Sequence, residues 1–131
     1  MPLEGLRVLL VDDDVDAREL FAIVLTEAGA EVRAAADAKE AMRAAIQWPP
    51  DVVVSDLVMP GTDGFSLLQE LRSMHHLRRM PAIAVSGMVS GPNREGALAV
   101  GFQEHIEKPL TPEALVAVVA RWARVSGDGA L

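Results

Sequence analysis

Apolar residues follow two patterns that alternate along the chain. Short apolar runs, of the kind that form strands buried on both faces of a parallel sheet, alternate with segments in which apolar residues recur every three or four positions, as in amphipathic helices. The short runs predict five strands, at residues 6–11, 31–36, 52–56, 82–85 and 102–107. The intervening segments predict five helices. This order indicates an α/β fold in which helices cover both faces of a doubly wound parallel sheet, with right-handed crossovers.

Capping residues support several of the predicted helix ends. Gly29 can adopt the left-handed conformation that follows a helix, and Asp37 with Glu40 three positions later forms a helix-starting box. Thr111 followed by Pro112 predicts the start of the last helix. The first helix carries its apolar positions at Ala17, Leu20, Phe21, Val24, Leu25 and Ala28. The fourth helix is expected to be short and mobile, because Gly and Pro leave only residues 94–100 to form it.

Length and composition bound the class of protein. With 131 residues, 50% of them hydrophobic, the chain is expected to form one domain over residues 1–125, followed by a disordered tail at 126–131. A net charge of −7 argues against direct binding of nucleic acid. The chain has no Cys, no basic and apolar leader, and no run long enough to enter a membrane, so a cytoplasmic protein is expected.

Polar side chains of a consistent kind follow the predicted strands. Asp12 and Asp13 follow the first, Asp56 ends the third, Ser86 ends the fourth and Lys108 follows the fifth. Each residue alone has an ordinary interpretation as a helix cap, a strand end or a solvated lysine. Together they meet at one edge of the sheet, where the carboxylates would repel one another unless a hard cation lay among them. Carboxylate oxygens are the ligands that Mg²⁺ prefers, so a magnesium site is predicted.

The same residues favour one kind of chemistry. Aspartates occupy the turn after the first strand, where a dinucleotide-binding protein would carry glycines, so a pyrophosphate site is excluded. A carboxylate beside Mg²⁺, with a hydroxyl and a lysine able to bind oxygens, suits attack by Asp56 on a phosphoryl group.

Four motifs resemble those of receiver domains of two-component response regulators. They are Val11-Asp-Asp-Asp14, Ser55-Asp-Leu-Val-Met-Pro-Gly-Thr-Asp-Gly64, Val85-Ser-Gly87 and Glu107-Lys-Pro109, and the resemblance runs from about residue 6 to residue 122. It implies a flavodoxin-like (βα)5 three-layer sandwich with Asp56 as the phosphorylated residue. It also implies Mg²⁺ held by the side chains of Asp13 and Asp56 and the carbonyl of Val58, with Asp12 reaching the metal through water.

The resemblance further assigns a switch. Ser86 stands at the switch hydroxyl, and Lys108 at the phosphate-binding lysine, whose bond to Pro109 is typically cis in the family. His105 stands where Tyr or Phe is usual, and burial of a group that titrates near neutral pH is expected to make the switch depend on pH.

A role in signalling follows from the same resemblance. The chain would accept a phosphoryl group from a histidine kinase or a histidine phosphotransfer protein. It would then contact a downstream protein through the fourth helix, the fifth strand and the fifth helix, as a monomer or weak dimer. Self-catalysed phosphoryl transfer and autodephosphorylation would make it a phosphoacceptor rather than a conventional enzyme.

Two other functions fit the sequence less well. An aspartyl-phosphate hydrolase of the haloacid-dehalogenase type needs a second Asp two residues after the nucleophile, and Val58 stands there. A pseudo-receiver that acts only as a docking module would not need the intact acidic residues, Ser86 and Lys108.

Overall fold

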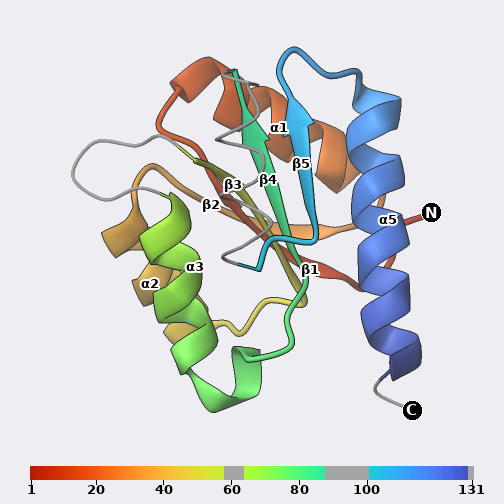
Figure 1. Ribbon diagram of the computed structural model, residues 1–131. Coiled ribbons are helices and arrows are strands. Elements are labelled where there is room, and N and C mark those ends of the chain that lie inside the picture. The colour runs from red at the N-terminus through yellow and green to blue at the C-terminus, as the bar shows by residue number, and fades with distance from the viewer. Residues whose placement is uncertain (58–63, 88–100, 130–131) are drawn as a thin grey trace.

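The computed structural model describes residues 1–57, 64–87 and 101–129, with side chains of the last helix described through residue 123. It contains one parallel sheet with the strand order β2-β1-β3-β4-β5 (Figure 1). The strands are β1 (Arg7–Val11), β2 (Glu31–Ala35), β3 (Val52–Asp56), β4 (Ala82–Ser86) and β5 (Glu104–Glu107). The predicted doubly wound sheet is therefore confirmed, because the strand order reverses direction at β1.

Four α-helices and one short 3₁₀ helix are described. They are α1 (Val15–Glu27), α2 (Ala38–Gln47), α3 (Gly64–Ser73), η1 (His75–Leu77) and α5 (Pro112–Gly129). Helices α1 and α5 cover one face of the sheet, and α2 and α3 cover the other (Figure 1). The helix predicted at residues 94–100 lies outside the described residues. Among the described helices, none combines the length and the apolar character that crossing a membrane requires.

Helix ends form where the capping residues predict them. Asp37 Oδ1 accepts the backbone N–H of Glu40 at 2.8 Å, and Thr111 Oγ1 accepts that of Ala114 at 3.1 Å. Gly29 follows α1 with φ +104°, a conformation that residues with a Cβ rarely adopt. The two cap hydrogen bonds fix where α2 and α5 begin, and the conformation of Gly29 fixes where α1 ends.

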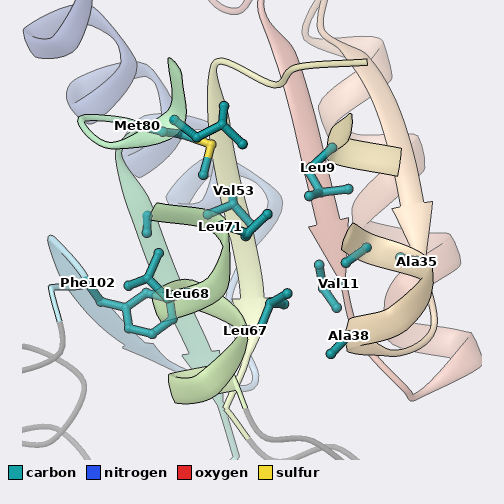
Figure 2. Close-up of a cluster of buried hydrophobic side chains, with 14 of the residues drawn as sticks. Leu9, Val11, Ala35, Ala38, Val53, Leu67, Leu68, Leu71, Met80 and Phe102 are labelled. Carbon is teal, nitrogen blue, oxygen red and sulfur yellow. The ribbon is translucent and has the colours of Figure 1, made fainter. Parts of the chain in front are cut away.

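Two apolar cores lie on opposite faces of the sheet. Alternate residues of β1 point to opposite faces, so that Leu9 packs toward α2 and α3 whereas Val8 packs toward α1 and α5. Figure 2 shows the core between the sheet and helices α2 and α3, in which Leu67, Leu68 and Leu71 of α3 lie over the sheet. Because β1, β3 and β4 are buried, the ends of these strands are held in fixed positions.

Helix α1 corrects one detail of the predicted core. Phe21 and Leu25 are buried, but Leu20 is 53% exposed. The helix has adjacent apolar pairs at positions 20–21 and 24–25, so the spacing alone does not decide which member of a pair faces the sheet.

The carboxyl-terminal end of the domain also differs from the predicted outline. The backbone of α5 is helical through Gly129, whereas a disordered tail was expected from residue 126. The domain limit at residue 125 stays a prediction.

Strand β5 begins at Glu104, two residues later than predicted. The residue before it, Gln103, forms a different set of bonds. Its backbone N–H donates to Ala82 O at 2.8 Å, while its side-chain Oε1 accepts the Ala82 N–H at 2.6 Å and a bond from Arg72 at 3.1 Å. Side-chain bonds thus replace part of the strand pairing at this end of the sheet.

Candidate functional site at the carboxyl edge of the sheet

The carboxyl ends of β1 and β3 bring three carboxylates together. In the parallel register Val11 of β1 pairs with Ser55 of β3, so the residues after Val11 lie beside Asp56. Carboxylate oxygens of Asp12, Asp13 and Asp56 all lie within 4.8 Å of one another. The pairing of β1 with β3 therefore brings these three residues together, as the sequence predicted.

The three carboxylates differ in exposure. Asp12 is 2% exposed and Asp56 is 9% exposed, whereas Asp13 faces solvent. Carboxylates this close repel one another, and burial of two of them strengthens the repulsion. An all-oxygen cluster with one solvent-facing member fits a hard divalent cation such as Mg²⁺, which keeps several water ligands.

Lys108 reaches the cluster from the end of β5. Its Nζ lies 2.7 Å from Asp12 Oδ2 and 3.6 Å from Asp56 Oδ2. The backbone N–H of Lys108 donates to Ser86 O at 2.9 Å, and the peptide bond to Pro109 is cis, as the family resemblance implied. Burial lowers the pKa of Lys108, but the hydrogen bond and charge of Asp12, with those of Asp56, outweigh it and leave this pKa above its usual value. The lysine is therefore held as a cation between two carboxylates.

The first aspartate is fixed through all of its polar groups. Asp12 Oδ1 accepts the backbone N–H of Asp14 at 3.0 Å, and Oδ2 accepts Lys108. Its backbone N–H donates to Ala35 O at 3.1 Å, and its carbonyl oxygen accepts Arg18 Nη1 at 2.8 Å. Asp14 has a separate role, because its Oδ1 caps α1 by accepting the N–H of Asp16 at 3.0 Å.

Arg18 is the contact that reasoning from the sequence missed. It lies in the first turns of α1, and three and seven positions later come the buried residues Phe21 and Leu25. Its place on this inward stripe was a usable signal, because a charged residue there must reach a polar partner.

Two more of the predicted site residues are described, and one is not. Ser86 ends β4 at 2% exposure, next to the strand that carries Asp56. His105 lies on β5 at 8% exposure, in register with Ala84 of β4. Val58, expected to offer a carbonyl oxygen, lies outside the described residues.

The model of the response regulator receiver domain family matches residues 8–120, which include the acidic cluster, Ser86 and Lys108. This chain belongs to that family. The match includes β1 from its second residue and the whole of the other four strands.

Similar proteins include both short and long chains. The chain is 36% identical over 120 residues to an uncharacterized 14.6 kDa protein of Leptolyngbya boryana, with 92% of each chain covered. It is 31% identical over 125 residues to the phosphate regulon transcriptional regulatory protein PhoB of Pseudomonas aeruginosa, covering 95% of this chain and 55% of the relative. The chain thus spans little more than half the length of that regulator.

Solved structures share the fold closely. The chemotaxis response regulator CheY4 of Vibrio cholerae superposes with a TM-score of 0.84 at 32% identity, covering 89% of this chain and 98% of that one. NtrX of Brucella abortus gives a TM-score of 0.88 at 33% identity, covering 94% of this chain and 28% of that one. The fold therefore occurs both as a short chain and as part of a much longer one.

Proposed function

We propose that this chain is the phosphoacceptor of a two-component phosphorelay, with Asp56 as the acceptor. One observation carries the proposal: Asp56 ends a buried strand with its carboxylate beside those of Asp12 and Asp13 and 3.6 Å from Lys108 Nζ. A nucleophilic carboxylate held beside a cation and an acidic ligand set suits phosphoryl transfer.

The transfer is a displacement at phosphorus. A carboxylate oxygen of Asp56 forms a bond to the phosphorus atom, and the bond between phosphorus and the donor's histidine nitrogen breaks. The nitrogen keeps the electron pair of the broken bond. Lys108 offsets the negative charge of the incoming group, and Ser86, at the adjacent strand end, offers a hydroxyl donor to a phosphoryl oxygen.

The acidic cluster would hold Mg²⁺ through Asp13 and Asp56, with Asp12 as a water-mediated ligand and the Val58 carbonyl as a further oxygen. The two oxygens of Asp12 already accept the Asp14 N–H and Lys108, which favours an indirect role for this residue. When bound, Mg²⁺ supplies positive charge that offsets repulsion between Asp56 and the phosphoryl oxygens.

The phosphoryl donor would be a histidine kinase or a histidine phosphotransfer protein. Ser86 and His105 would then transmit phosphorylation to a surface that includes β5 and α5 and contacts a downstream protein. The fourth helix predicted for this surface, at residues 94–100, lies outside the described residues. Support comes from the packing: Ser86 ends β4, and β4 pairs with β5, where His105 is buried.

The test is to incubate the protein with acetyl phosphate and Mg²⁺ and to measure its intact mass. We expect the wild-type chain to gain one phosphoryl group and Asp56→Asn to gain none. Asp16→Asn is the matched control, because Asp16 is an exposed aspartate in the first turn of α1 and should leave the gain intact. Phosphorylation of Asp56→Asn to the wild-type extent would refute the assignment.

A further inference from the structure

Arg18 makes a bond that ties helix α1 to the acidic turn. Its Nη1 donates to the carbonyl oxygen of Asp12 at 2.8 Å, across six residues of sequence. That carbonyl belongs to the peptide group joining Asp12 to Asp13. The guanidinium therefore holds the orientation of the peptide between the two acidic residues.

The remaining bonds of this turn do not replace the contact. The Asp12 N–H is held by Ala35 O, and Asp12 Oδ1 is held by the Asp14 N–H. Both bonds lie on the β1 side or within the turn, whereas Arg18 connects the turn to the body of α1. Its own backbone N–H donates to Asp14 O at 2.9 Å, so Arg18 holds the turn from both its backbone and its side chain.

The position of Asp13 depends on this arrangement. Asp13 is the exposed member of the cluster, and its carboxylate lies within 4.8 Å of those of Asp12 and Asp56. Rotation of the peptide before Asp13 would move its Cα and swing the carboxylate away from the cluster. Bonds from an ionised donor to a carbonyl are stronger than neutral ones, so the Arg18 contact suits this restraint.

We propose that Arg18 is a positioning residue that sets the affinity of the acidic cluster for Mg²⁺ by fixing the Asp12–Asp13 peptide. It acts through Asp13 and touches neither the metal nor the phosphoryl group. The inference rests on the proposed function for its biological meaning, but metal affinity can be measured without phosphorylation.

The charge of Arg18 and its positioning of Asp13 predict opposite changes in Mg²⁺ affinity when Arg18 is replaced. A cation near the cluster repels Mg²⁺, so its removal would raise the affinity if charge alone mattered. If Arg18 positions Asp13, its removal lowers the affinity despite the lost repulsion. Groups that orient metal ligands typically change affinity by about tenfold or more when they are replaced.

The experiment is a calorimetric titration of MgCl2 into the metal-free full chain, compared with Arg18→Met, which keeps an apolar stem of similar length. We expect a dissociation constant roughly tenfold higher in Arg18→Met. The glutamine of Arg18→Gln is polar but too short to reach the carbonyl, so this variant should lose the same amount of Mg²⁺ affinity. If Arg18→Met does not fold, the comparison uses Arg18→Gln alone. The matched control is Arg43→Met, which removes an exposed arginine from α2 and should leave the affinity unchanged.

A second measurement separates positioning from general loss of structure. In metal-free NMR spectra the amide signals of Asp13 and Asp14 should shift in the Arg18 variants, while signals of β3 and β4 stay in place. Thermal unfolding in EDTA shows whether each variant is folded. A folded Arg18 variant that binds Mg²⁺ as tightly as the wild type, or more tightly, would overturn the inference.

The experiments can refute the proposed function and this inference independently of each other. If the wild-type chain binds Mg²⁺ and the Arg18 variants bind it more weakly, the inference holds even where acetyl phosphate adds no mass to Asp56. If Asp56 is phosphorylated and the Arg18 variants keep the wild-type affinity, the function stands and the inference is wrong.

Discussion

Backbone position gives three consecutive aspartates different chemistry. Asp12 follows β1 directly, is buried and has both side-chain oxygens bonded. Asp13 is exposed and belongs to the acidic cluster, and Asp14 caps α1. The side chains are identical, so the difference comes from the backbone groups and the charges that each one meets. Of these three aspartates, only Asp12 lies within salt-bridge distance of Lys108.

Lys108 should show its pairing as a pH dependence of stability. Its pKa in the folded chain lies above the usual 10.5, because Asp12 and Asp56 outweigh the effect of burial. A raised pKa contributes stability that is complete below the unfolded value and is lost as the pH rises through the folded value. In EDTA, the difference in unfolding free energy between wild type and Lys108→Met should stay constant from about pH 7 to 9 and shrink above 10.5.

The other lysine of the chain provides the control. Lys39 is exposed on α2, so Lys39→Met should not produce a comparable loss at high pH. Urea unfolding followed by tryptophan fluorescence measures both differences. A Lys108 difference that fell between about pH 7 and 9 would contradict the raised pKa.

At the scale of elements, α3 begins directly against the end of β3. The backbone N–H of Gly64 donates to Leu57 O at 2.9 Å. A Cβ at Gly64 would collide with the carbonyl oxygen of Asp56 and lie 3.0 Å from Leu57 Cα. The glycine therefore lets the helix approach the backbone of Asp56, the proposed phosphoacceptor.

Replacing Gly64 by Ala should push α3 away from Asp56. Overpacking of this kind typically lowers stability by about 1–3 kcal/mol, and the displaced Asp56 should be phosphorylated more slowly. Gly87→Ala is the control for stability, because no described atom lies within 4 Å of a Cβ there. Urea unfolding and the initial rate of mass gain with acetyl phosphate are the measurements. Equal stability of the two variants would show that α3 adapts without strain.

Strand periodicity and capping residues were enough to predict the five strands and the four described α-helices, because these signals are local and repeat along the chain. The acidic cluster was predictable for a related reason, since parallel strands deliver their carboxyl ends to one edge. The partner of Arg18 was not predictable: its position on the buried stripe of α1 indicates that it needs a polar partner, but periodicity does not say that this partner is the Asp12 carbonyl. The exposure of Leu20 was not predicted, because the spacing of apolar residues in α1 fits two faces of the helix equally well. Gln103 bonds across to β4 and thereby shortens β5, a tertiary contact that propensity does not encode.

At the scale of the whole molecule, two buried cores stabilise a sheet whose carboxyl edge carries mutually repelling carboxylates. Apolar side chains on both faces hold β1 and β3 in place, which restrains the carboxylates at their carboxyl ends from moving apart to relieve repulsion. The net charge of −7 adds to this repulsion at long range. A metal ion bound by this cluster only in the folded chain would therefore stabilise the fold.

Asp13→Asn should separate these two contributions. Without metal it removes one of three mutually repelling carboxylates, so we expect a higher melting temperature than that of the wild type in EDTA. With Mg²⁺ at a hundred times the dissociation constant, the wild type should gain about 2.7 kcal/mol, and Asp13→Asn should lose most of that gain. Asp16→Asn removes an equal charge from the start of α1, where a carboxylate is favourable, so it should not raise the melting temperature and should keep the Mg²⁺ response. Thermal unfolding followed by circular dichroism measures all three chains, and an undiminished Mg²⁺ response in Asp13→Asn would exclude this residue as a ligand.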